Sequence, residues 1–190
     1  MRNLLASGFV LLVVGCAPQS PPRFAPSEPL VLPGSDGRTH DVMAAVTRAK
    51  LTVFVFYSKS CPCLSVHEPR LAALAREYRA QNVTWFIVDS EVDADPESDA
   101  REAQRRGYVM PLLTDRGARV ARAMNAEFAT HAVVVDASGR IRYSGAIDSD
   151  KNRLHEAARS YLSDALNAIL AGREPRTAER EPLGCALMLY

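Results

Sequence analysis

The chain lacks an excess of charge of either sign, because 23 lysines and arginines face 22 aspartates and glutamates. Nucleic-acid binding needs a basic surface field, and a disordered polyelectrolyte needs a surplus of one charge. Neither class fits this sequence, so we expect no nucleic-acid partner. Hydrophobic residues fill 47% of the 190 positions, which suits one domain with a buried core and some excess at its ends.

Long apolar runs are missing as well. No stretch of about 18 apolar residues occurs, so we expect no membrane-spanning helix in the mature protein. Leu4 to Val14 is a short apolar stretch that follows Arg2 and precedes Gly15-Cys16. A positive residue, a short apolar segment and a small residue predict a secretory signal peptide over residues 1–16. Its end resembles the bacterial lipobox, in which the cysteine, here Cys16, is diacylated and becomes the mature N-terminus.

The lipobox resemblance implies a location in the bacterial cell envelope. Ala17 follows the cysteine, and by resemblance to Gram-negative sorting rules a residue other than Asp favours the outer membrane. We therefore expect a lipoprotein that faces the oxidising periplasm and touches the membrane through its lipid anchor only. Residues 17–28 are rich in proline and predict an extended tether with no core to join.

The middle of the chain alternates strand and helix patterns. Continuous apolar runs at residues 51–57 and 83–88 predict strands buried on both faces, as in a parallel sheet. Further expected elements are helices over 62–80, 96–107, 118–124 and 154–169, a strand at 111–113, and a hairpin with strands at 132–135 and 140–143. This order predicts an α/β domain over residues 29–172, with a mixed sheet covered by helices on both faces, and a tail over 173–190.

Cysteine is scarce: besides Cys16, the chain contains Cys61, Cys63 and Cys185. Cys61 lies where the first buried strand gives way to a helix. The unpaired N–H groups at a helix start favour a thiolate and lower the pKa of a thiol placed there. Cys61 is therefore the predicted nucleophile.

This placement resembles the thioredoxin superfamily. The redox cysteine follows five positions after Phe56, and Pro69 follows eight residues after Cys61, where thioredoxins place the proline that kinks this helix. Residues 133–145 resemble the late hairpin of redoxins of the AhpC/TSA and TlpA type, and residues 111–115 resemble their central strand and turn. The resemblance implies a thioredoxin-like fold and a thiol–disulfide oxidoreductase that uses no cofactor and acts on a disulfide- or thiol-bearing envelope protein.

The cysteine motif departs from that family. The sequence reads C-x-C rather than C-x-x-C, and Leu64 occupies the usual position of the resolving cysteine. Residues two apart on a helix point to nearly opposite sides, so Cys61 and Cys63 can form only a strained disulfide, and only if Cys61 is the non-helical cap. The resolving thiol is therefore either Cys63 or the tail residue Cys185.

A second departure lies opposite the cysteines. His131, preceded by Thr130, stands where the family places a cis-proline against the active cysteine. We expect the substrate to dock over Tyr57, Pro62, Thr130 and His131.

Two other functions stay open. Two thiolates and an imidazole suit Cu(I), so the alternative is a metallochaperone that binds Cu(I) through Cys61, Cys63 and either His131 or Cys185. Envelope copper-delivery proteins of this fold usually show C-x-x-x-C, which is absent here. A thiol peroxidase ranks third, because Ser58 fits the hydroxyl of the peroxiredoxin motif P-x-x-x-[ST]-x-x-C, whereas Phe54 replaces its proline.

Other polar residues are interpreted as structural or solvated. His67, on the helix that begins at Cys61, is expected at the surface. Asp89, Glu91, Asp93 and Asp95 follow the second strand and predict a solvated acidic loop rather than a calcium site, because the glycine and terminal glutamate of an EF-hand loop are missing.

Overall fold

The computed structural model describes residues 22–189. The predicted signal peptide, Cys16 and the first part of the predicted tether lie outside the described residues. Within the described range, no helix combines the length and apolar character needed to cross a membrane.

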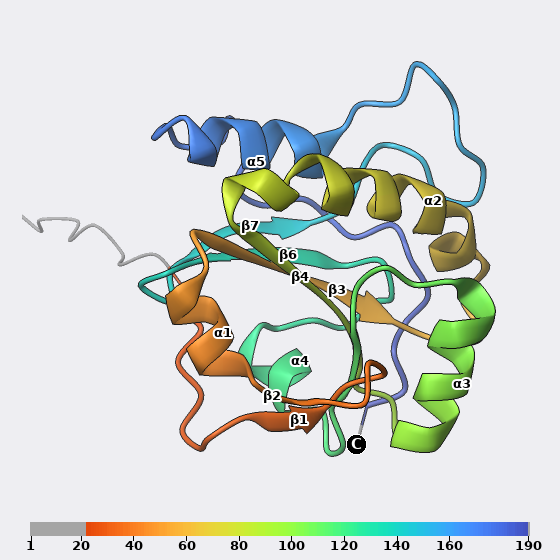
Figure 1. Ribbon diagram of the computed structural model, residues 1–190. Coiled ribbons are helices and arrows are strands. Elements are labelled where there is room, and N and C mark those ends of the chain that lie inside the picture. The colour runs from red at the N-terminus through yellow and green to blue at the C-terminus, as the bar shows by residue number, and fades with distance from the viewer. Residues whose placement is uncertain (1–21, 190) are drawn as a thin grey trace, which may run out of the picture.

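The core is a five-stranded mixed sheet with the strand order β5-β4-β3-β6-β7 (Figure 1). Its strands are β3 (Leu51–Tyr57), β4 (Val83–Asp89), β5 (Leu112–Thr114), β6 (Ala132–Asp136) and β7 (Ile141–Gly145). The first three run parallel, and β6 and β7 are antiparallel to their neighbours. Every residue of β3 is buried, because this apolar strand is paired on both edges and covered on both faces. The predicted α/β, thioredoxin-like fold is confirmed.

Helices cover both faces of the sheet (Figure 1). One face carries α2 (Pro62–Glu77) and α5 (Tyr161–Leu170). The other face carries α1 (Val42–Arg48), α4 (Arg119–Ala123) and a small ribbon of β1 (Val31–Pro33) and β2 (Thr39–Asp41). Helix α3 (Pro96–Arg106) packs beside β5, and a 3₁₀ turn, η1 (Arg79–Gln81), follows α2.

The last helix is shorter than predicted. Helix α5 begins at Tyr161, whereas the apolar pattern predicted a start near residue 154. The preceding residues form a loop held by short polar side chains. Ser149 Oγ accepts a hydrogen bond from the Arg159 N–H, and an Asp150 carboxylate oxygen accepts one from the His155 N–H. Such local side-chain acceptors compete with helical hydrogen bonds, which explains the late start.

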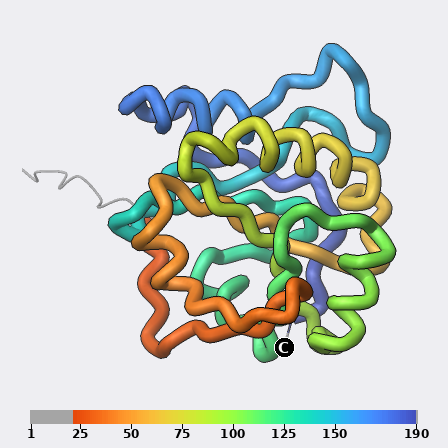
Figure 2. Tube along the Cα trace, viewed as in Figure 1, coloured from red at the N-terminus to blue at the C-terminus, as the bar shows by residue number. Residues whose placement is uncertain are grey.

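The described part of the predicted tether packs on the domain. Phe24 is buried, and its N–H donates to the Gly139 carbonyl at 2.8 Å. The Ile141 N–H donates to the Pro22 carbonyl, so this segment extends the β6–β7 hairpin (Figure 2). The expectation that residues 17–28 have no core to join is therefore wrong for Phe24, whose aromatic ring supplies the apolar surface that the neighbouring prolines lack.

The tail also packs on the domain. We call residues 178–188 the C-terminal strap, because they run back across β7 and the loop before β6 (Figure 1). The Arg180 N–H donates to the Ser144 carbonyl, and the Ala129 N–H donates to the Cys185 carbonyl at 2.8 Å. A Cβ at Gly184 would lie 1.7 Å from the Ala129 carbonyl oxygen, so only glycine permits this close approach.

Candidate active site

Cys61 is the N-cap residue of α2. Its backbone is extended, with φ −80° and ψ 109°, and Pro62 occupies the first turn of the helix. Proline suits this position because it lacks an N–H that would otherwise be left without a partner. Cys61 is therefore the non-helical cap that a close approach to Cys63 requires.

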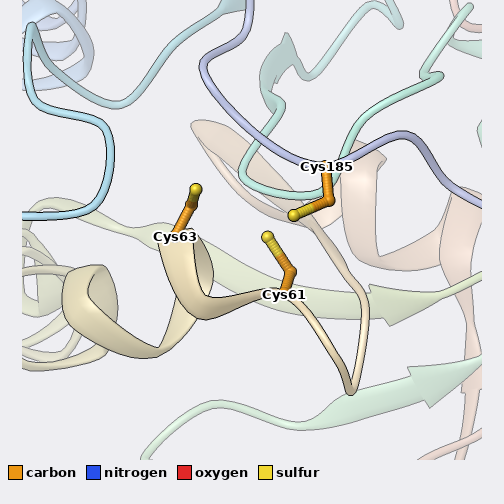
Figure 3. A group of neighbouring side chains, drawn as sticks. All are labelled: Cys61, Cys63 and Cys185. Carbon is orange, nitrogen blue, oxygen red and sulfur yellow. The ribbon is translucent and has the colours of Figure 1, made fainter.

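The structure brings the three predicted redox cysteines together. The Sγ atoms of Cys61, Cys63 and Cys185 all lie within 4.8 Å of one another. Figure 3 shows the first two at the start of α2 and Cys185 on the strap, with its sulfur pointing toward Cys61. All three are free thiols; Cys61 and Cys63 are buried, and Cys185 is partly exposed. The tail thus reaches the site, which the sequence left open.

The three thiols differ in proton affinity. Burial raises the pKa of Cys61, but the Cys185 thiol and the Leu64 backbone N–H stabilise its thiolate, and its pKa is lowered overall. Burial and the negative charge of Cys61 raise the pKa of Cys63. The hydrogen bond to Cys61, with burial, raises the pKa of Cys185 to about 12. The arrangement places Cys61, whose pKa is lowered, beside two thiols whose pKa values are raised.

The predicted docking set is largely covered. Tyr57, Thr130 and His131 are 1%, 2% and 6% exposed, whereas Pro62 is exposed. The strap crosses the backbone next to Thr130, and the Tyr57 ring packs under the Arg106 guanidinium. The expectation that these residues form an accessible surface is therefore wrong, except for Pro62.

His131 is separated from the cysteine cluster. Its Nε2 lies 2.7 Å from Ser144 Oγ on β7, and burial lowers its pKa to about 4, which keeps the imidazole neutral. Among residues 22–189, the group that could hold a metal ion consists of the three cysteines without His131. The peptide bond before it is trans, as are the others in this range.

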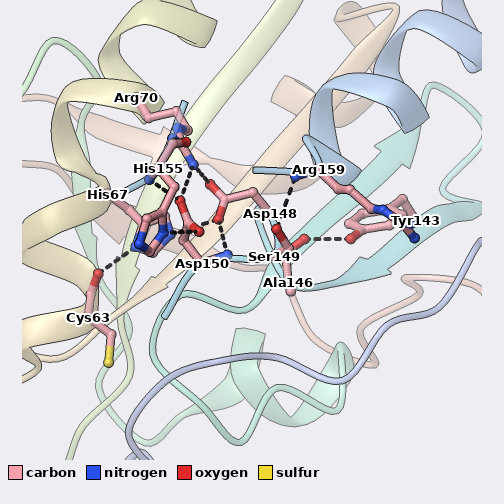
Figure 4. A network of polar contacts seen from close by, with 10 residues as sticks. All are labelled: Cys63, His67, Arg70, Tyr143, Ala146, Asp148, Ser149, Asp150, His155 and Arg159. Atoms are coloured by element: carbon pink, nitrogen blue, oxygen red, sulfur yellow. Dashed lines mark hydrogen bonds and ion pairs between the residues drawn. The ribbon is translucent and has the colours of Figure 1, made fainter. Parts of the chain in front are cut away.

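His67 is buried, not exposed as expected. Its Nδ1 lies 2.6 Å from the Cys63 carbonyl oxygen, and its Nε2 lies 3.2 Å from Asp148 Oδ1 (Figure 4). The carbonyl and the carboxylate both accept hydrogen bonds, so these contacts favour the doubly protonated ring. Burial lowers the pKa of His67, but these bonds outweigh it and raise the pKa overall. Leu64, His67 and Leu71 follow one helical stripe, a signal that places His67 on the inner face.

Two members of the predicted acidic loop are also buried. Asp89 and Glu91 are each 5% exposed. Glu91 Oε1 accepts a hydrogen bond from the Met188 N–H of the strap, and Asp89 Oδ1 accepts one from the Glu91 N–H. Burial raises the pKa of Asp89 to about 8. The solvated-loop expectation is therefore wrong at these two positions, where the strap and α3 cover the end of β4.

Comparison with known proteins identifies the family. The family model for redoxin matches residues 18–161, a region that contains Cys61 and Cys63 and ends before Cys185. The chain belongs to the redoxin family. No curated protein sequence matches this redoxin.

Solved structures support the same fold. An uncharacterised conserved protein of Geobacillus kaustophilus aligns with a TM-score of 0.77 and 24% identity, covering 89% of this redoxin and 93% of that chain. A hypothetical protein of Sinorhizobium meliloti aligns with a TM-score of 0.77 and 22% identity, covering 90% and 97%. Peroxidoxin BcpB of Mycobacterium tuberculosis aligns with a TM-score of 0.53 and 16% identity, covering 65% and 84%. At these identities the likeness establishes the fold, and family membership supports a thiol-based redox function.

Proposed function

We propose that this redoxin is a thiol–disulfide oxidoreductase of the bacterial envelope, in which Cys61 is the nucleophile and Cys185 the resolving thiol. One observation carries the proposal: the Cys61 sulfur, whose pKa is lowered, lies within 4.8 Å of two protonated thiols. In this proposal a lipid on Cys16 anchors the protein, and the substrate is a disulfide in another envelope protein.

The reaction transfers two electrons from the protein to the substrate. The Cys61 thiolate attacks one sulfur of the substrate disulfide, a mixed disulfide forms, and the first substrate thiolate leaves and takes up a proton. The Cys185 thiol then loses its proton and attacks Cys61 Sγ, which releases the second substrate thiol. A Cys61–Cys185 disulfide remains.

The backbone context favours Cys185 over Cys63 as the resolving thiol. Cys63 lies in the first turn of α2, so its sulfur is tied to a helix, and a ring closed with Cys61 is small and strained. Cys185 lies on the strap, and the hydrogen bond of its thiol to Cys61 already directs it at the sulfur it would attack. Cys63 is then a third thiol that can exchange with the disulfide.

The exposure of the two sulfurs and the pKa of the leaving thiol both indicate which sulfur is attacked when the Cys61–Cys185 disulfide is reduced again. Cys61 is 1% exposed, whereas Cys185 is partly exposed. An incoming thiolate therefore attacks Cys185 Sγ and expels the Cys61 thiolate, which is the better leaving group because its pKa is lowered and that of Cys185 is raised. The exposed Pro62 and the strap around Cys185 form the surface available to that reductant.

Thiol peroxidase is the second candidate, and the burial of Cys61 favours it. A peroxide is much smaller than a protein disulfide, so it needs less displacement of the strap to reach Cys61. The Cys61 thiolate would attack one peroxide oxygen and release an alcohol or water, leaving a sulfenic acid. Cys185 would then attack that sulfur, forming the Cys61–Cys185 disulfide and water.

Disulfide mapping of single-serine variants tests the assignment. The reduced protein is mixed with a peptide disulfide, and separately with hydrogen peroxide, and the products are identified by peptide mass spectrometry. We expect Cys61→Ser to be inactive, Cys185→Ser to accumulate a mixed disulfide on Cys61, and Cys63→Ser to retain turnover. Retained turnover in Cys185→Ser with loss in Cys63→Ser would assign resolution to Cys63, and activity in Cys61→Ser would refute the proposal.

A further inference from the structure

We propose that Cys61, Cys63 and Cys185 also form a binding site for Cu(I) in which all three ligands are sulfur. This inference does not require disulfide turnover, because it concerns the fully reduced protein. It adds a metal-binding activity to the same three side chains.

The spacing of the sulfurs fits one metal ion. Bonds between a thiolate and a metal are about 2.3 Å long, so three sulfurs around one ion in a plane lie about 4 Å apart. The three Sγ atoms of the site all lie within 4.8 Å of one another before any ion is added. Two ligands come from the start of α2 and the third from the strap, so small side-chain rotations and a slight approach of the strap complete the site.

The donor set selects a soft ion of low coordination number. Thiolates favour Cu(I), whereas structural zinc takes four protein ligands. In the described part of the chain the donor group offers three cysteines and no fourth histidine or carboxylate. His131, the histidine suggested by the sequence, is instead bonded to Ser144 through Nε2. Three-coordinate Cu(I) therefore fits this group better than zinc.

The surroundings compensate the charge of the complex. Three thiolates and one Cu(I) carry a net charge of −2, and binding releases the thiol protons. The positive end of the sixteen-residue helix α2 faces the site. The Lys151 ammonium acts on Cys63, and His67 Nδ1 lies 2.6 Å from the carbonyl oxygen of the same residue. Burial of Cys61 and Cys63 keeps water away from the sulfurs.

Metal binding and disulfide formation use the same sulfurs and exclude each other. A disulfide that includes Cys61 removes two of the three ligands at once. We therefore expect the reduced protein to bind Cu(I) and the oxidised protein to release it.

An anaerobic titration with Cu(I) tests the proposal. The full chain, with Cys16 replaced by serine so that three thiols are counted, is reduced and titrated against a chromogenic Cu(I) chelator. We expect one Cu(I) per chain, and X-ray absorption should show three sulfur neighbours at about 2.3 Å. Cys63→Ser and Cys185→Ser should each weaken binding by more than about tenfold, whereas His131→Gln should leave it unchanged.

The outcomes separate this inference from the oxidoreductase proposal. Binding that is lost in His131→Gln and kept in Cys185→Ser would overturn the three-sulfur site. Failure to compete with the chelator, with disulfide exchange intact, would reject the metal site and leave the oxidoreductase. Stoichiometric binding without disulfide or peroxide turnover would support the metal site and reject the oxidoreductase. His40→Gln, at a histidine on β2 that contacts Asp36, controls for nonspecific binding to imidazole.

Discussion

The chemistry of the site depends on how three identical side chains differ in proton affinity. Cys61 caps α2 and receives a hydrogen bond from the Cys185 thiol, whereas the negative charge of Cys61 acts on Cys63, the second residue of the helix. The sequence predicts Cys61 as the nucleophile from the strand-to-helix junction alone, and this role stays a prediction. It cannot rank the other two, because that ranking depends on where the strap lies.

Replacing the donor thiol tests this ranking. We expect Cys185→Ala to raise the pKa of Cys61, because the strongest stabilising contact of its thiolate is lost. The pKa is read from the pH dependence of iodoacetamide labelling at Cys61, followed by mass spectrometry. The matched variant is Cys63→Ala, which keeps the backbone N–H at residue 63 and should shift the pKa less. An unchanged Cys61 profile in Cys185→Ala would contradict the hydrogen bond.

Asp89 supplies a second prediction at the residue scale. Burial raises its pKa from 3.8 to about 8 in the folded protein, and its proton is shared with the neighbouring carboxyl of Asp99. The folded state therefore holds a proton that the unfolded state loses, so stability is greatest below pH 4 for this group and falls as the pH rises to about 8.

The variant Asp89→Asn should remove this pH dependence. An asparagine can accept from the Glu91 N–H and donate to Asp99, as the protonated acid does. We expect the variant to be more stable than the wild-type protein at pH 8 and to show a flatter stability profile. Urea unfolding at pH 5, 6.5 and 8 measures the free energy of unfolding of both proteins. The same change of this free energy with pH in both proteins would refute the prediction.

At the scale of elements, helix α2 is anchored by a contact that the sequence does not display. The strand β3, the helix start at Pro62 and the hairpin β6–β7 follow from local apolar patterns, and the structure has them near the predicted positions. The His67–Asp148 contact joins residues 81 positions apart. No local pattern encodes such a pair, although the inner-face position of His67 was readable from the helical stripe.

Removing Asp148 should destabilise the protein strongly. Asp148 is fully buried and contacts both His67 and Arg70, so Asp148→Ala leaves the buried His67 without its carboxylate partner and leaves Arg70 with Asp150 alone. The expected loss is on the order of 3 kcal/mol in the free energy of unfolding. Urea denaturation at pH 6 measures it, and a loss near zero would show that water replaces the carboxylate.

The loss of stability caused by His67→Gln should depend on pH. The pKa of His67 is raised in the fold, so its stabilising effect is complete below the unfolded value near 6.5 and is lost as the pH rises through the folded pKa. The difference between wild-type protein and variant should therefore shrink toward alkaline pH. A difference that grows with pH would contradict the assignment of an imidazolium.

The strap offers a prediction from a single glycine. A Cβ at residue 184 would collide with the Ala129 carbonyl, so Gly184→Ala should push the strap and Cys185 away from Cys61. We expect less Cys61–Cys185 disulfide after mild oxidation, while Cys61 still reacts with small reagents. Gly37→Ala is the control, because its added Cβ meets no atom within 4 Å, although its φ of +75° strains the new side chain. Equal disulfide yields in both variants would show that the strap adjusts.

For the whole molecule, the two ends of the described chain pack at opposite ends of the sheet, and only the strap reaches the redox site. The segment at Phe24 extends the hairpin, and the strap bonds to β7, to the loop before β6 and to Glu91. Neither end has a periodic pattern, because each follows the surface of a domain already formed. Sequence patterns therefore predicted the sheet and its helices but treated both ends as unstructured.

Deleting residues 178–190 should leave the fold intact and change the reactivity of Cys61. Helix α5 and the sheet lie before the deletion, so the truncated protein should keep its far-ultraviolet circular dichroism while unfolding at a lower urea concentration. Cys61 loses its cover and its hydrogen-bonding thiol together. The rate at which a bulky disulfide reagent modifies Cys61 should then rise more than the rate of a small reagent. The mixed disulfide on Cys61 should persist, because Cys185 is absent. Rapid resolution by Cys63 would show that the helix thiols suffice, and the strap would then serve to exclude large substrates rather than to complete the reaction.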